Sequence, residues 1–190
     1  MKQILLTVIL LFVLGGCAQK RHYYVLSAPH QITATDHRIE QVIGVEDLQV
    51  PEYLHEGRIA LLQKNNRVIY LNDALWAVDM QKDLTDALIF DLQKSLPGSV
   101  IVHYPWESAG RDVDLVVRVK ITRFIASQNE VYLDAVVRVG DHDKILSFKE
   151  PIESMQADNI VEGMKRAFFR LERAVTTLLD DIALSQKKQR

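Results

Sequence analysis

Apolar and polar residues alternate most clearly over two neighbouring stretches of the chain. Every second residue is apolar from 113 to 121 and again from 131 to 139. Side chains of a β-strand point alternately to its two faces, so both stretches predict strands with one buried face. Polar residues at 127–129 and 140–143 predict turns after which the chain reverses, and a third short strand is expected at 144–148. We therefore expect consecutive antiparallel strands with one face in water.

Shorter apolar stretches predict the remaining strands. They lie at 23–26, 41–50, 58–63, 67–71 and 100–104. The polar run Lys64-Asn65-Asn66 separates the third of these from the fourth, which is typical of a hairpin turn.

Two other stretches repeat their apolar residues every three or four positions, which predicts amphipathic helices. The apolar residues of the first are Trp76, Met80, Leu84, Leu88 and Leu92. Asn72 or Asp73 is expected to cap the start of this helix, and Pro97-Gly98 to end it.

The second helix is expected from about 158 to 185. Its apolar stripe consists of Ile160, Met164, Ala167, Phe168, Leu171, Val175, Leu178 and Ile182. Its polar side is expected to carry Lys165, Arg166, Arg170, Glu172 and Arg173. A helix with one apolar stripe packs against a sheet, so the sequence predicts an α+β fold: a mostly antiparallel β-sheet with two long helices packed on one face.

The chain begins with a separate apolar run, residues 4–14, which follows the basic Lys2. This run is shorter than the roughly 20 residues needed to cross a bilayer, and its layout is that of a secretory signal. It ends in Leu14-Gly15-Gly16-Cys17, which resembles the lipobox of bacterial lipoproteins.

The lipobox resemblance implies cleavage between Gly16 and Cys17, a diacylglyceryl group on the sulfur of Cys17 and an acyl group on its new amino terminus. No other cofactor is expected. The remaining alternative is a chance cysteine in an uncleaved anchor. Ala18 stands where inner-membrane lipoproteins tend to carry Asp, so by analogy with that sorting rule the protein is placed on the periplasmic face of the outer membrane.

Composition and length fit one domain behind this anchor. The expected division is a signal peptide at 1–16, a lipidated N-terminus with a leader and a short first strand at 17–38, one domain at 39–185 and a polar tail at 186–190. Cys17 is the single cysteine, which excludes an intramolecular disulfide. The formal net charge of -2 gives no reason to expect a nucleic-acid partner.

The sequence contains little that points to catalysis. None of the six histidines has the spacing of a metal-ligand pair. Glycine-rich phosphate loops and a Gly-x-Ser-x-Gly nucleophile motif are absent from the sequence. We therefore expect neither an enzyme nor a metalloprotein.

Bulky side chains are the remaining candidates for a functional surface. Tyr53 and Leu54 follow a predicted strand, Trp76 is expected to open a helix, and Trp106 lies in a polar loop. Each is a candidate partner contact: the three aromatic residues because aromatic side chains are enriched at binding hot spots, and Leu54 as the bulky neighbour of Tyr53. The alternative for each is packing in the core or at a helix end.

Several stretches in order resemble one known family. They are the lipobox, 23–26, the run Val50-Pro51-Glu52-Tyr53-Leu54, Leu75-Trp76-Ala77, and 151–154 before the last helix. The chain is similar to the ABC-transport auxiliary lipoproteins and, within them, to the PqiC family (paraquat-inducible protein C). It departs from that pattern at Val78-Asp79, where the family usually has a Glu-Pro-like step.

The resemblance implies a non-enzymatic outer-membrane subunit of an intermembrane lipid-transport system that supports envelope integrity. Its partners would be an MCE-domain protein of the inner membrane (PqiB-like), whose periplasm-spanning tube it docks, and further copies of itself in a ring-like homo-oligomer. A leader between Cys17 and the core would set its distance from the membrane. The alternatives are an assembly factor for another outer-membrane complex and a periplasmic lipid-binding carrier.

Overall fold

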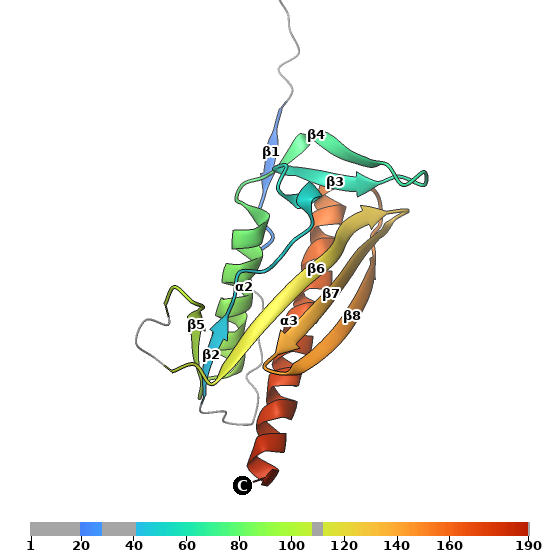
Figure 1. The fold of residues 1–190 in the computed structure, drawn as a ribbon. Helices are drawn as coiled ribbons and strands as arrows, with labels where there is room; N and C mark the ends of the chain where they lie inside the picture. The colour runs from blue at the N-terminus through green and yellow to red at the C-terminus, as the bar shows by residue number, and fades with distance from the viewer. Residues whose placement is uncertain (1–19, 28–40, 108–111, 190) are drawn as a thin grey trace, which may run out of the picture.

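One twisted sheet of eight strands, with two helices behind it, forms the fold (Figure 1). The computed structural model describes residues 20–27, 41–107 and 112–189. In chain order its strands are β1 (His22–Tyr24), β2 (Val42–Val45), β3 (Arg58–Leu62), β4 (Val68–Trp76), β5 (Val100–His103), β6 (Leu115–Ser127), β7 (Glu130–Val139) and β8 (His142–Pro151). A short 3-10 helix, η1 (Glu52–Leu54), precedes β3, and the long helices are α2 (Met80–Ser95) and α3 (Ala157–Gln189). The predicted α+β fold is confirmed.

The predicted meander consists of β6, β7 and β8, and each of these strands pairs antiparallel with the next one along the chain. Gln128 and Asn129 form the first turn with φ angles of 51° and 60°, the left-handed pair that suits a two-residue hairpin. In β7 the alternate residues from Val131 to Val139 are buried toward the helices. β6 continues to Ser127, beyond the predicted end at 121. The register of its pairing with β7 shifts between Ile121 and Arg123, and the two strands remain paired after this shift.

β6 also joins the two remaining parts of the sheet. Near its start Leu115 pairs with Ile43 of β2, and near its end Ala126 pairs with Leu61 of β3. Both pairings are parallel, as are β2 with β5 and β1 with β4. The longest pairings, β6 with β7 and β7 with β8, are antiparallel. The sheet is mixed because these four shorter pairings are parallel.

The first helix begins later than the sequence pattern predicted. Trp76 is the last residue of β4, with 6% of its surface exposed, and does not open the helix. Asp79 is the N-cap, and its side chain accepts a hydrogen bond from the amide of Lys82 at 3.0 Å. The prediction that Asn72 or Asp73 caps this helix is therefore wrong, because both residues lie inside β4.

α3 packs along the meander with the predicted stripe toward the sheet, and it also contacts α2. The prediction fails at Glu172, which was expected on the polar side and is only 3% exposed. At Gly163 the helix comes so close to the sheet that an added Cβ would overlap Ile152 and lie 2.9 Å from Val131 Cγ2. Glycine is therefore required at this contact.

The first strand joins the sheet almost at once. β1 pairs with the last part of β4, with Tyr24 opposite Trp76. The predicted leader between Cys17 and the core is consequently interrupted by β1, which leaves residues 18–21 between the cysteine and the sheet. Most of the stretch predicted to form the leader, residues 28–37, lies outside the described residues.

Candidate functional site

The segment that follows Cys17 is held on the domain by two acidic residues from different helices. Asp83 of α2 is buried, and its carboxylate accepts hydrogen bonds from the amides of Leu26 at 2.9 Å and Ser27 at 3.2 Å, and from the Ser27 hydroxyl. Asp158 of α3 accepts a hydrogen bond from the Tyr24 hydroxyl at 2.8 Å. Desolvation of the ring, followed by this carboxylate, raises the pKa of Tyr24 to about 12, so the phenol stays a donor at any physiological pH.

Together with the β1–β4 pairing, these bonds fix where the N-terminal segment leaves the domain. A buried carboxylate is costly unless it is hydrogen-bonded, and the two amides and the hydroxyl supply what Asp83 needs. We call residues 22–27 with Asp83 and Asp158 the anchor clamp. Sequence reasoning missed both carboxylates, since an acidic residue on a helix looks the same whether it faces water or a second segment.

Asp83→Ala is expected to loosen the anchor clamp. The free energy of unfolding should fall by about 1 kcal/mol, because the amide of the buried Leu26 loses its acceptor. Hydrogen exchange at the Leu26 and Ser27 amides should become faster. Asp86→Ala, an exposed position on the same helix, is the control and should leave that exchange unchanged. Equal exchange in the two variants would contradict the clamp.

The predicted contact residues separate into buried and exposed ones. Leu54 and Trp76 are 2% and 6% exposed. Both side chains pack in the core and are therefore not available as partner contacts. Tyr53 is half-buried, and its hydroxyl accepts a hydrogen bond from the Phe124 amide at 2.8 Å, which ties η1 to β6. Trp106 remains at the surface with 75% of its area exposed. Among the four, Trp106 alone keeps a side chain largely free for a partner.

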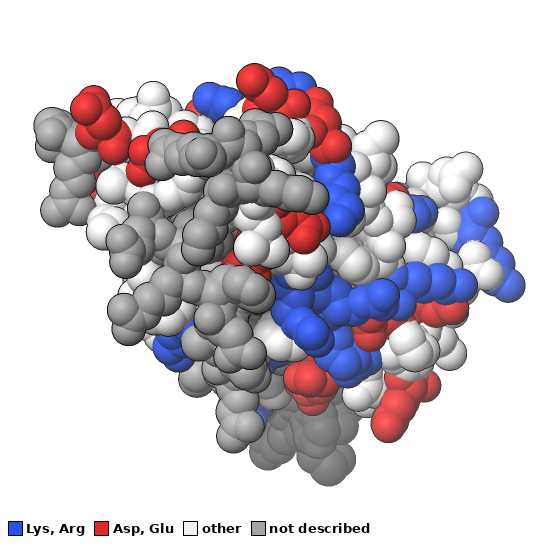
Figure 2. All heavy atoms as spheres, turned by 90° about the horizontal axis from the view of Figure 1, so that it is seen from below, with Lys and Arg blue, Asp and Glu red and all other residues white. Residues whose placement is uncertain are grey.

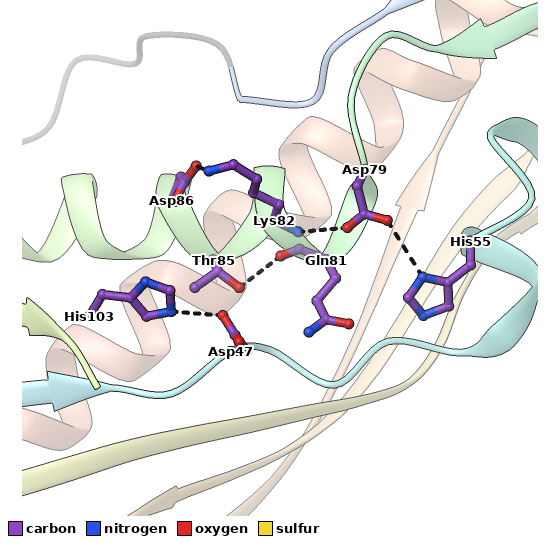
Figure 3. Close-up of a pocket in the computed structure, with 8 residues that line it drawn as sticks. All are labelled: Asp47, His55, Asp79, Gln81, Lys82, Thr85, Asp86 and His103. Atoms are coloured by element: carbon purple, nitrogen blue, oxygen red, sulfur yellow. Dashed lines mark hydrogen bonds and ion pairs between the residues drawn. The ribbon is translucent and has the colours of Figure 1, made fainter. Parts of the chain in front are cut away.

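A polar hollow of about 500 Å³ lies between α2, the segment after β2 and the end of β5 (Figure 3). His103 and Asp47 stand at one end, with Nε2 and Oδ1 2.7 Å apart. His55 and Asp79 stand at the other end, with Nδ1 and Oδ2 3.6 Å apart. The remaining lining residues come from α2 and are Gln81, Lys82, Thr85 and Asp86.

Most side chains that line the polar hollow are held in ion pairs and hydrogen bonds with neighbouring residues. Lys82 is paired with Asp86 at 2.7 Å, and the Thr85 hydroxyl donates to the carbonyl of Gln81 and accepts from the Leu48 amide. In the described part of the chain, no three His, Cys, Asp or Glu side chains are grouped so that they could hold a metal ion. The arrangement suits contact with polar groups of a partner.

The solvated face of the sheet is polar as well. A second hollow of about 220 Å³ there is lined mainly by charged residues, including Arg118, Lys120 and Arg138. Arg118 is paired with Glu46 at 2.7 Å, and Arg138 makes two contacts of 2.6 Å to Asp143. Figure 2, which looks at the end where α3 finishes, shows a band of Lys and Arg side chains with acidic residues beside it.

Cys17 and Gly16 lie outside the described residues, so the lipidation of Cys17 and the cleavage before it stay predictions. Within residues 20–27, 41–107 and 112–189, neither long helix is apolar enough over a sufficient length to cross a membrane.

The sequence model of one protein family, described as the ABC-type transport auxiliary lipoprotein component, matches residues 24–176. The chain belongs to this family. Its members are auxiliary lipoproteins of transport systems and not enzymes, so the family and the non-enzymatic role expected from the sequence are confirmed. The matched range contains both hollows and the anchor clamp from Tyr24 onward.

Individual relatives agree with the family assignment. The chain is 28% identical over 121 residues to the intermembrane transport lipoprotein PqiC of Escherichia coli strain K12, and equally to PqiC of Shigella flexneri. The match covers 62% of this chain and 64% of each relative, which is less than two thirds of their length. A crystal structure of a Xanthomonas campestris protein has the same fold, with a TM-score of 0.70 and 13% identity over 89% of this chain and 99% of the other.

Proposed function

We propose that this auxiliary lipoprotein is anchored in the outer membrane through acyl groups on Cys17 and is one subunit of an intermembrane lipid-transport system. The observation that carries the proposal is the family match over residues 24–176, beside a lipobox-like sequence that ends at Cys17. The PqiC relatives are named intermembrane transport lipoproteins, which also supports this proposal.

The partner in this proposal is an MCE-domain protein of the inner membrane, whose tube the lipoprotein docks at the outer membrane. Several copies of the chain would surround the end of the tube. The surface features that suit such contacts are the exposed Trp106 and the polar hollow with its two His–Asp pairs. Ion pairs at an interface set partner choice and orientation more than affinity.

The first test is to purify the acylated, tagged protein from membranes in a mild detergent and to analyse its complexes by native mass spectrometry. We expect an MCE-domain protein together with several copies of this chain. The control is an unrelated domain carrying the same first 21 residues, which should bring down neither. A β-barrel partner without an MCE protein, or a monomer that carries an additional lipid, would contradict the proposal.

A further inference from the structure

The β3–β4 hairpin has an outward face that is partly apolar and a basic tip. Val68 is 38% exposed, and Tyr70 lies under the Arg58 guanidinium, whose carbon is 4.9 Å from the ring centre. The tip carries Lys64 and Arg67, both exposed and, within the described part of the chain, in no ion pair. Aromatic and basic side chains with exposed apolar neighbours are typical of segments that lie at a lipid headgroup layer.

This face continues onto β1, across an irregularity in the β3–β4 pairing between Arg58 and Ala60. Leu75 of β4 pairs with Tyr23 on one side and with Arg58 on the other, and paired residues point to the same face of a sheet. Tyr23 is 63% exposed. One surface therefore connects the strand next to the lipid anchor with the hairpin, and we call it the hairpin face (Tyr23, Arg58, Lys64, Arg67, Val68 and Tyr70).

The charge of these segments is opposite to that of the whole chain. Residues 20–27 contain two basic and no acidic residues, and residues 58–76 contain three basic residues and one acidic residue. Together they carry a formal charge of about +4, whereas the chain carries -2. Basic side chains are attracted to anionic lipid headgroups within about one Debye length.

Chain length places this surface close to the bilayer. Four residues separate Cys17 from His22, and the five Cα-to-Cα steps between the two reach at most about 18 Å when fully extended. Figure 1 shows the hairpin lying across the same end of the molecule as β1, with the end of α3 at the opposite end. An acyl group on Cys17 would therefore bring the hairpin end, and not the end of α3, toward the lipid.

We propose that the hairpin face lies on the anionic headgroup surface of the membrane that holds Cys17. This inference rests on the proposed lipid anchor and adds a fixed orientation to it. Three acyl chains already provide stable attachment, so the hairpin face sets how the domain stands on the membrane. The end of α3 then points away from the bilayer.

The lone cysteine makes a direct test possible. In the acylated protein the sulfur of Cys17 is blocked, so one introduced cysteine is the single free thiol for an environment-sensitive dye. Asn65→Cys places the dye at the hairpin tip, and Ser185→Cys, an exposed position on α3, is the matched control. Both proteins are inserted in vesicles of phosphatidylcholine with about one third phosphatidylglycerol, some of which carry a nitroxide quencher on the acyl chain.

We expect the dye at residue 65 to be quenched by the lipid nitroxide and the dye at residue 185 to remain unquenched. Adding Lys64→Gln and Arg67→Gln to the Asn65→Cys protein should lower the ratio of bound to free hairpin by roughly 30-fold, because each basic residue near an anionic surface is worth about fivefold in binding. Vesicles of phosphatidylcholine alone should show the same loss.

The mass of the purified protein shows whether Cys17 is acylated, and so distinguishes a failure of the lipoprotein proposal from a failure of the orientation. An unmodified Cys17 would overturn the lipoprotein proposal and, with it, the orientation. Acylated protein with no quenching at residue 65, or with equal quenching at 65 and 185, would overturn the orientation alone. Quenching that is unchanged by the two Gln substitutions would also overturn it, since the basic tip would then have no part in the contact.

Discussion

Replacing Gly163 by valine should lower the free energy of unfolding by about 3 kcal/mol. The reason is the close approach of α3 to the sheet, where even a Cβ would overlap Ile152 and come within 2.9 Å of Val131 Cγ2. Both neighbours are β-branched, so their χ1 angles are restricted and their Cγ2 methyl groups cannot rotate away cheaply. Urea unfolding followed by circular dichroism measures the loss.

A second substitution distinguishes crowding from helix propensity. Ile152→Ala removes the nearest methyl group, so Gly163→Val should cost at least 1 kcal/mol less in that background, a coupling typical of residues in contact. The control is Glu162→Ala, one residue earlier and exposed, which should change stability by about 0.5 kcal/mol or less. Strictly additive effects of Gly163→Val and Ile152→Ala would contradict the crowding explanation.

Glu172→Gln should stabilise the protein at alkaline pH and have little effect under acidic conditions. Burial, followed by the neighbouring carboxyl of Asp91 on α2, raises the pKa of Glu172 well above its ordinary value of 4.5. Neither Glu172 carboxyl oxygen has a hydrogen-bond partner of acceptable geometry in the described structure, so no donor there offsets its charge. Glutamine removes the charge and keeps the shape.

The direction of this pH dependence follows from which state binds the proton of Glu172 more tightly. The folded state holds the proton of Glu172 more tightly than the unfolded state, so its stabilising effect is complete below pH 4.5 and is lost as the pH rises toward the raised pKa. The loss is at most about 1.4 kcal/mol per pH unit over that window. At about pH 8 the variant should therefore be more stable than the parent by about 2 kcal/mol, or roughly 4–8 °C in melting temperature.

Melting curves at about pH 5 and pH 8 measure this difference. Asp181→Asn, an exposed position on the same helix, is the control and should shift both curves by less than about 0.5 kcal/mol. The explanation fails if Glu172→Gln changes the melting temperature equally at the two pH values, because a buried charge matters only where it forms.

Sequence periodicity was sufficient for the meander and for most of both helices. It was reliable where one face of an element meets the core along its whole length, as in β7 and along the stripe of α3. It failed at Trp76, which continues the four-residue spacing from Met80 backward and yet ends a strand. The polar pair Asn72 and Asp73 looked like a helix cap, although both lie within β4, which pairs with β1 and β3.

The candidate sites were harder to predict, because they depend on which segments meet. The parallel contacts of β6 with β2 and β3 leave no trace in an alternating pattern, since alternation does not fix the direction of a partner strand. Asp83 and Glu172 had the same appearance as exposed acidic residues on helices. One proved to be satisfied by the N-terminal segment, and the other faces a second carboxyl between two helices.

The position of β6 in the chain has a consequence for the order in which the fold can assemble. During synthesis, β1 to β5 are complete before residue 115 appears, and the two parts of the sheet that they form are joined only through β6. Until then, apolar side chains such as Ile43 and Leu61 lack their β6 neighbours, and such exposed strands are prone to aggregate. Because pairing between distant segments is slow, we expect folding to be limited by the arrival of β6, and a chain stopped before residue 115 to need a chaperone to stay in solution.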